Sequence, residues 1–177
     1  MNNRIPFASR RPLDPRRVNI SVDGNVFNRG QSAEADRLID RLEALEAAGS
    51  INFVMAGGVR DEMLDPATPA IKQGAAMGKI FNLRPSRNEE QQRARRVVAT
   101  ILQGNAKPET HAADASHLSE AAETGCGYFI TGDGRILRKR DELAAALPPS
   151  LQIVPLDEFL AILDQYVAED VFNKEIP

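Results

Sequence analysis

The hydrophobic and polar positions of the chain follow two different periods. Residues 18–22 alternate apolar and polar side chains and are rich in β-branched types, so they predict a strand that ends at Asp23. Residues 51–55 predict a second strand, and Gly49 just before it is typical of a helix end. Between the strands, four apolar residues recur at helical spacing: Ala35, Leu38, Leu42 and Leu45. Strand, helix and strand in this order favour a parallel βαβ unit.

The middle of the chain predicts helices. Pro66 and Pro69 interrupt the pattern before an expected helix over residues 71–81. Ser86 and Glu89 have the spacing of a capping box, which predicts the start of another helix. The apolar face of that second helix would consist of Val97, Val98, Ile101 and Leu102.

The last third of the chain completes an α/β pattern. Two helices and two short strands are expected, in the order helix 112–123, strand 128–131, strand 151–154 and helix 156–167. Because strands alternate with helices along the whole chain, the predicted fold class is α/β with a parallel sheet.

We divide the chain into one domain and two flanking segments. The domain covers residues 18–168, and its helical middle runs over about 66–107. Residues 1–17 hold five arginines and three prolines, which predicts an irregular basic arm, either a solvated tail or an arm that contacts phosphates. Residues 169–177 are expected to form a C-terminal tail.

Composition narrows the function classes. The formal net charge is −3, there is one cysteine, Cys126, and there are two histidines, so an intrachain disulfide and a thiolate zinc cluster are excluded. Aromatic residues make up 5% of the chain, too few for a base-stacking platform. No stretch approaches the roughly 20 apolar residues of a membrane span, and the N-terminus lacks an apolar signal segment. We therefore expect a cytoplasmic protein without membrane contact. No glycine-rich loop supports a nucleotide cofactor.

Four acidic residues are expected at one edge of the sheet. Asp23 ends the first strand, Glu62 lies near the start of the helix after the second strand, Asp114 opens the helix before strand 128–131, and Asp133 follows that strand. Crossover helices begin near the carboxyl ends of parallel strands, so the four side chains are expected to converge there. Asp61 is an alternative to Glu62.

Gathered carboxylates repel one another unless cations lie between them. Mg²⁺ and Mn²⁺ prefer oxygen ligands of this kind, and a pair of such ions can activate water and stabilise the leaving oxygen of a phosphodiester. Each acid also has a plainer explanation: Asp23 and Asp133 as turn residues, Glu62 and Asp114 as first-turn acids favoured by the helix dipole.

The sequence resembles the PIN-domain family in four motifs. The first is Asp-Gly-Asn-Val-Phe at 23–27, and the second is Val-Arg-Asp-Glu-Met-Leu at 59–64. The third is an acid opening an alanine-rich helix at 114–121, and the fourth is Tyr-Phe-Ile-Thr-Gly-Asp at 128–133. The resemblance covers roughly Val18 to Leu160, and Gly24 stands where a hydroxyl residue is frequent in the family.

The resemblance implies a three-layer α/β/α sandwich and Mg²⁺- or Mn²⁺-dependent nuclease activity, usually on RNA. It makes Asp23, Glu62, Asp114 and Asp133 the catalytic and metal-binding residues. Asn25 and Thr131 would orient these acids or the attacking water. Many members are toxins of toxin–antitoxin pairs and many form dimers, so an antitoxin protein and a second copy are expected partners.

Two basic clusters lie near the predicted site. Arg135, Arg138, Lys139 and Arg140 follow Asp133 and would bind RNA phosphates, with a solvated helix face as the alternative. Arg93, Arg95 and Arg96 form a second cluster, for which the solvated face is favoured. His117 follows Asp114 by three positions and can share its helix face, although we expect a packed or surface histidine there. His111 is equally ambiguous, and Cys126 is expected to be structural.

The leading hypothesis is therefore a metal-dependent endoribonuclease of PIN type that uses water as its nucleophile. The alternative is a non-catalytic PIN-like module that binds RNA or a protein. A dehalogenase-like phosphatase is disfavoured because Asp23-Gly24-Asn25 lacks the second acid of an Asp-x-Asp pair.

Overall fold

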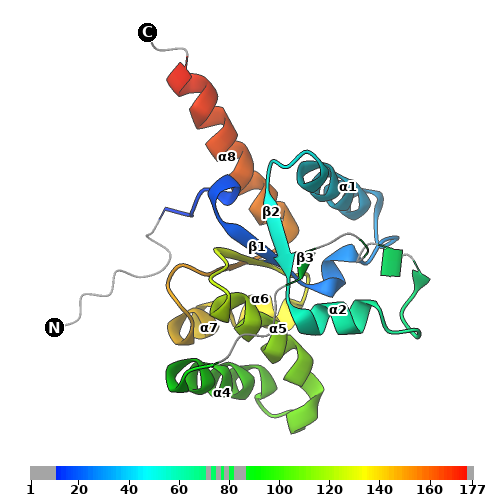
Figure 1. The fold of residues 1–177 in the computed structure, drawn as a ribbon, viewed down its shortest axis with the longest axis vertical. Helices are drawn as coiled ribbons and strands as arrows, with labels where there is room; N and C mark the ends of the chain where they lie inside the picture. Colours follow the sequence, from blue (N-terminus) through cyan, green and yellow to red (C-terminus); the bar gives the residue numbers. More distant parts are fainter. Residues whose placement is uncertain (1–10, 71–72, 75–76, 78–79, 82–86, 175–177) are drawn as a thin grey trace, which may run out of the picture.

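The computed structural model describes residues 11–70, 73–74, 77, 80–81 and 87–174 (Figure 1). Within them, five strands form one sheet in the order β3-β2-β1-β4-β5. Each neighbouring pair is parallel. The strands are β1 (Asn19–Val22), β2 (Asn52–Met55), β3 (Ile80–Phe81), β4 (Tyr128–Ile130) and β5 (Gln152–Val154). The predicted α/β class with a parallel sheet is confirmed.

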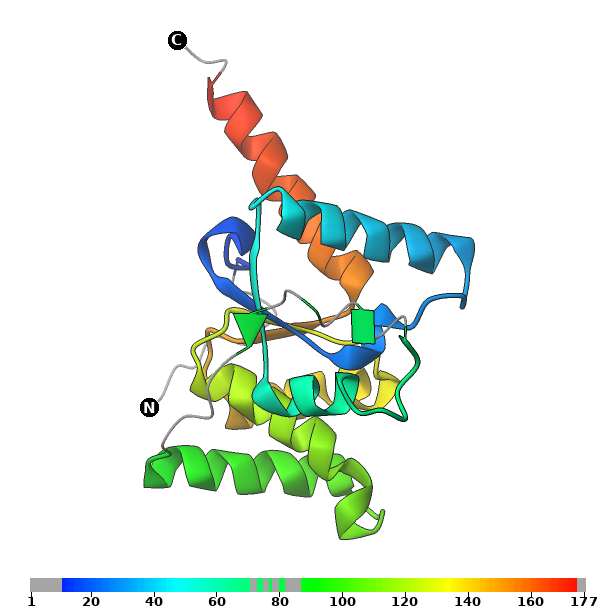
Figure 2. The same ribbon diagram turned by 45° about the vertical axis from the view of Figure 1, so that its right-hand side comes forward.

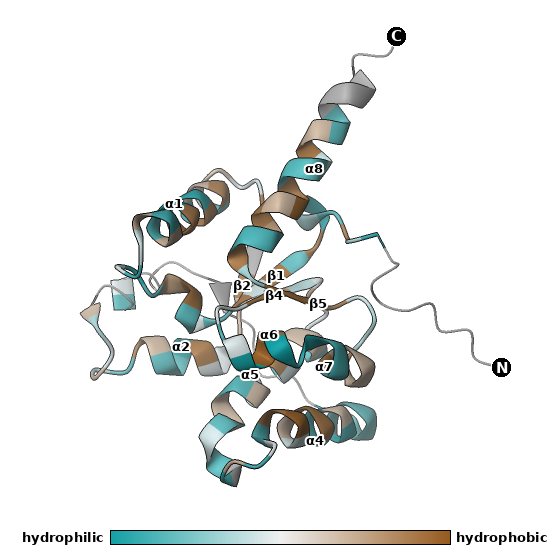
Figure 3. Ribbon diagram, turned by 180° about the vertical axis from the view of Figure 1, so that it is seen from behind, coloured by the Kyte–Doolittle hydropathy of each residue, from teal (hydrophilic) through white to brown (hydrophobic). Residues whose placement is uncertain are grey.

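Helices lie on both faces of the sheet (Figure 2). On one face lie α1 (Ala33–Ala47) and α8 (Leu156–Lys174), and their apolar residues pack with Ile20 and Val22 of β1. On the other face lie α2 (Gly57–Met63), α4 (Glu89–Gln103), α5 (Ala112–Glu123), α6 (Gly134–Arg138) and α7 (Arg140–Ala146). Figure 3 shows hydrophobic colours on the strands and mixed colours on the helices that cover them.

The central strands are buried on both faces. Tyr128 and Ile130 belong to the apolar cluster under α1 and α8, whereas Phe129 between them belongs to the cluster under α4 and α5. Successive side chains of a strand point to opposite faces, so one short strand contributes to both clusters. This explains why strand 128–131 is apolar at nearly every position.

Two elements of the middle segment differ from the predictions. Residues 71–81 were expected to be helical; Gln73 and Gly74 are helical, but Ile80 and Phe81 form β3, which pairs with Val54 and Met55 of β2. Residues 71–72, 75–76 and 78–79 lie outside the described residues. The second difference is the start of α4, where Asn88 and Gln91 form the capping box. The side-chain oxygen of each residue accepts a hydrogen bond from the backbone N–H of the other. Ser86 lies outside the described residues, and Glu89 is the first residue of the helix.

The segment before β1 is attached to the C-terminal helix. Arg11 forms an ion pair with Glu169, and Arg16 forms one with Asp170 at 2.6 Å. The Tyr166 hydroxyl donates a hydrogen bond to the carbonyl of Pro12. The C-terminal tail was expected to begin at residue 169, but α8 continues to Lys174. Glu169 and Asp170 of this helix bind Arg11 and Arg16, at the described end of the basic arm.

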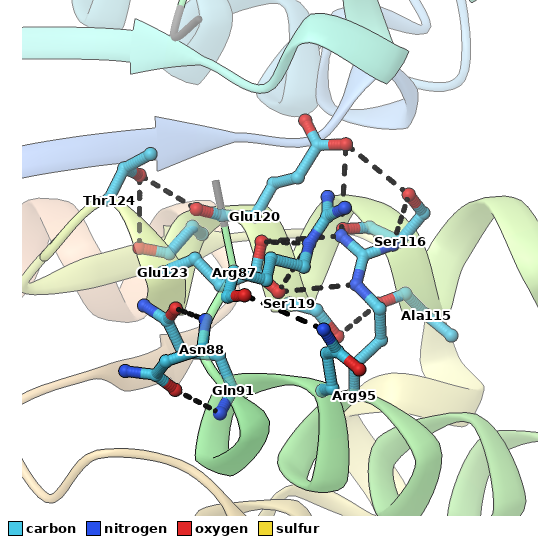
Figure 4. A network of polar contacts seen from close by, with 12 residues as sticks. Arg87, Asn88, Gln91, Arg95, Ala115, Ser116, Ser119, Glu120, Glu123 and Thr124 are labelled. Carbon is cyan, nitrogen blue, oxygen red and sulfur yellow. Dashed lines mark hydrogen bonds and ion pairs between the residues drawn. The ribbon is translucent and has the colours of Figure 1, made fainter. Parts of the chain in front are cut away.

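A polar network joins α4 to α5 (Figure 4). Glu123 of α5, whose side chain is 4% exposed, accepts hydrogen bonds from Arg87 at 2.9 Å and from Arg95 at 3.2 Å. Arg95 also donates to the Ser116 hydroxyl. Arg95 is therefore part of a structural network, while Arg93 and Arg96 are exposed on α4. Because α5 carries Asp114 and His117, the network also supports the predicted site.

No helix in the described part of the chain combines the length and the apolar character needed to cross a membrane.

Candidate functional site

Asp23 is the centre of a buried polar cluster at the carboxyl end of β1. It is 5% exposed, and its backbone N–H donates to the Ile130 carbonyl of β4 at 2.9 Å. Burial raises the pKa of the Asp23 carboxyl above its usual range, whereas the hydrogen bond from Thr131 and the charge of His117 lower it. A buried carboxylate beside a sheet edge is the kind of group that binds a cation or handles a proton.

Thr131 and Asn25 hold one oxygen of this carboxylate. Asp23 Oδ2 accepts hydrogen bonds from the Thr131 hydroxyl and from the Asn25 amide, both at 2.8 Å. The Asn25 amide oxygen in turn accepts from the Gly132 N–H at 2.8 Å. Both residues therefore lie where they can orient Asp23, and its other oxygen, Oδ1, accepts no hydrogen bond from the described residues.

Glu62 and Asp114 lie within electrostatic reach of Asp23, and each raises the pKa of the Asp23 carboxyl. Glu62 comes from α2, which follows β2, and Asp114 comes from the first turn of α5. Their side chains are 56% and 29% exposed, respectively, so these two acids lie between the buried Asp23 and the solvent. The neighbouring Asp61 is exposed on α2, and His111 Nδ1 lies 3.4 Å from Asp114 Oδ2.

His117 lies between two of the acids, a position that sequence reasoning did not assign. Its side chain is 4% exposed, with Nδ1 4.0 Å from Asp23 Oδ1 and Nε2 4.0 Å from Glu62 Oε2. Nδ1 is buried and has no hydrogen-bond partner among the described residues. The signal for this placement was the spacing of three residues from Asp114, which puts both side chains on one face of α5.

Asp133 is connected to the cluster differently. Its Oδ1 accepts hydrogen bonds from the backbone N–H groups of Arg135 (2.6 Å) and Ile136 (3.3 Å), so it caps the first turn of α6. Its own N–H donates to the Thr131 hydroxyl at 3.0 Å. The structure thus places Glu62 and Asp114 within electrostatic reach of Asp23, and it links Asp133 to Asp23 through Thr131.

The donor chemistry of this cluster fits a hard divalent cation. In the described part of the chain, no three His, Cys, Asp or Glu side chains already lie close enough to form a metal site. Asp23 Oδ1 and the buried Nδ1 of His117 nevertheless form no hydrogen bond with these residues, although the two atoms lie 4.0 Å apart, and Glu62 and Asp114 lie within electrostatic reach. Oxygen donors of this kind suit Mg²⁺ or Mn²⁺.

The basic cluster after Asp133 is largely engaged with the protein. Lys139 donates a hydrogen bond to the Ile101 carbonyl, and Arg135 donates to the Leu102 carbonyl at 3.4 Å. These contacts satisfy carbonyl groups in the last turn of α4, where cations are favoured. Arg140 pairs with Glu158 at 2.9 Å, while the exposed Arg138 has no hydrogen-bond or ion-pair partner among the described residues.

Comparison with known proteins adds no relative: no family model, no curated protein and no solved structure matches the chain. What the chain does has to be argued from its own residues.

Proposed function

We propose that this chain is a metal-dependent endoribonuclease of PIN type that cleaves RNA with Mg²⁺ or Mn²⁺. The observation that carries the proposal is the buried Asp23 carboxylate, held through one oxygen by Thr131 and Asn25 while Glu62 and Asp114 act on it electrostatically. Carboxylates collected at the carboxyl edge of a parallel sheet occupy the usual ligand position of open α/β folds.

The proposal includes the finer architecture, a three-layer α/β/α sandwich. Helices on both faces of the sheet and two apolar clusters support this layering, with Val59 and Met63 of α2 joining the cluster under α1 and α8.

Each residue of the site would have a separate role. Asp23, Glu62 and Asp114 would hold the metal, with Asp133 at the rim of the site. The bound metal would supply activation of water and stabilisation of the leaving oxygen. Thr131 and Asn25 fix Asp23 Oδ2 and leave Oδ1 to the ligand. Arg138 is the member of the basic cluster best placed to contact an RNA phosphate, because it is exposed and has no partner among the described residues.

Replacement of two of the acids tests this mechanism. Asp23→Asn and Asp114→Asn should abolish Mn²⁺-dependent cleavage of a labelled single-stranded RNA, and Asp141→Asn, at an exposed acid of α7, serves as the matched control. Circular dichroism and urea unfolding would show that the variants fold. Full activity in both site variants would contradict the mechanism.

A second candidate is a non-catalytic PIN-like module that binds RNA or a protein. It is favoured by one observation, that no three ligands in the described residues are already arranged around a metal position. Calorimetric titration with Mg²⁺ and Mn²⁺ separates the two candidates: RNA binding without any metal binding would favour the module. The antitoxin partner and the homodimer stay predictions.

A further inference from the structure

A cavity of about 200 Å³ lies beside the carboxylate cluster, between the start of α1 and the start of α8. Asn25, Thr131 and Gly132 line the cavity, and the first two also hold Asp23. The cavity and the carboxylate cluster therefore share a wall, and a ligand that spans both would place one part in each.

The cavity has both aliphatic and polar lining residues. Its apolar lining consists of Val26, Ala35, Leu38, Ile39, Pro155 and Leu156. Besides Asn25 and Thr131, three polar side chains line it: Asn28, Gln31 and Asp157. Within the described part of the chain, none of these three side chains has a hydrogen-bond or ion-pair partner, so their donors and acceptors are available to a ligand. Gln31 and Asp157 are exposed, and Asn28 is half-buried.

The charge of the cavity excludes a phosphate as its occupant. No lysine or arginine is among the described residues that line it, and Asp157 is an acceptor that repels anions. The ligand group that fits has an apolar face and N–H donors on its edge. A nucleobase with an amino group has both properties, and carboxylates accept hydrogen bonds from such amino groups.

We propose that this cavity binds one unstacked base of a single-stranded RNA, next to the phosphate at the carboxylate cluster, and that Asp157 makes it favour bases with an exocyclic amino group over uracil. The inference rests on the proposed nuclease function and adds a base-binding subsite to it. Single-stranded RNA is recognised through splayed bases whose edges form hydrogen bonds, while phosphates are held elsewhere.

The test uses nucleosides, which carry no phosphate, and omits metal, so it does not depend on catalysis. Adenosine, cytidine and uridine are titrated into the isotope-labelled full chain and followed by nuclear magnetic resonance. The signals of Asn28 and Gly132 should shift, with affinity for adenosine and cytidine about threefold or more above that for uridine. No shift at these residues would overturn the subsite.

Two variants locate the binding. Ala35→Phe fills the cavity from α1 and should weaken nucleoside binding at least about tenfold. Ala44→Phe makes the same change at an exposed position of the same helix and should bind nucleosides as the unmodified chain does. Asp157→Asn, at an exposed position, should bring the affinities for cytidine and uridine together. Equal affinities of these two nucleosides for the unmodified chain would refute the role of Asp157.

The outcomes for the subsite and for the nuclease are distinguishable. Nucleoside binding that Ala35→Phe abolishes, in a chain that cleaves no RNA, would support the subsite and contradict the nuclease. Metal-dependent RNA cleavage that Ala35→Phe leaves unchanged, with no nucleoside binding, would support the nuclease and overturn the subsite.

Discussion

Replacing Thr131 with valine removes one hydroxyl group from the centre of the candidate site and leaves the side chain similar in shape. Thr131 is fully buried, so water cannot replace the lost group. Its hydroxyl donates to Asp23 Oδ2 at 2.8 Å and accepts from the Asp133 N–H at 3.0 Å and from the Asn25 amide at 3.3 Å. The substitution therefore tests how much this cluster stabilises the fold.

The lost hydrogen bonds set the magnitude, and the two shorter ones contribute most of it. A hydrogen bond to a charged group contributes about 1.5–3 kcal/mol and a neutral one about 0.5–1.5 kcal/mol. We expect Thr131→Val to lower the free energy of unfolding by about 2–4 kcal/mol at pH 7. The matched control is Thr131→Ser, which keeps the hydroxyl and loses a methyl group, at a cost of about 0.5–1.5 kcal/mol.

The deficit of the valine variant should depend on pH. The Thr131 hydrogen bond lowers the pKa of the Asp23 carboxyl, so it stabilises the ionised form of that group. Stabilisation of an ionised carboxylate is present at high pH and lost as pH falls through the folded-state pKa. The difference between the unmodified chain and Thr131→Val should therefore be largest at neutral pH and smaller in acid.

Equilibrium urea unfolding, followed by circular dichroism at several pH values, measures these differences. The reasoning is refuted if Thr131→Val is no less stable than Thr131→Ser at pH 7, or if its deficit does not shrink in acid.

Four further predictions follow from the same geometry. Asp23→Asn should raise the free energy of unfolding at pH 7. Burial raises the pKa of the Asp23 carboxyl, so its ionisation destabilises the fold as pH rises, and the advantage of the variant should disappear below about pH 4. Urea unfolding at several pH values measures this difference. In Gly58→Ala, the new Cβ would lie 3.0 Å from two ring atoms of His117, so RNA cleavage should fall about tenfold or more, measured as kcat/KM. Glu123→Gln should weaken the attachment of α4 and lower the free energy of unfolding by about 1–3 kcal/mol in urea, and an unchanged value would show that its ion pairs contribute little. Leu102→Ala should cost about 2–5 kcal/mol in the same assay, since this side chain is fully buried.

The sequence was most informative where structure depends on local pattern. Alternation over residues 18–22 and the helical spacing of Leu38 and Leu42 predicted β1 and α1, and Gly49 past the end of α1 has the positive φ, 66°, that favours glycine. The position of Asp23 and Asp133 at strand ends also followed from the pattern, because parallel strands present their carboxyl ends at one edge.

Local pattern was insufficient where a residue's surroundings come from distant parts of the chain. Ile80 and Phe81 are a strand because β2 pairs with them, and a two-residue strand has no period to recognise. Lys139 and Arg135 appeared as a free basic cluster, but the end of α4, more than thirty residues earlier, uses them as hydrogen-bond donors.

The sequence alone thus determined the order of β1, β2, β4 and β5 along the chain and the edge at which the acids lie, whereas β3, α6 and α7 were not predicted. Only the tertiary structure decided how these acids are organised: Thr131, just after β4, holds Asp23, His117 lies between Asp23 and Glu62, and Asp133 caps α6. The physical reason is that hydrophobic period encodes which face of an element is buried, whereas hydrogen bonds and charges act between side chains that folding brings together.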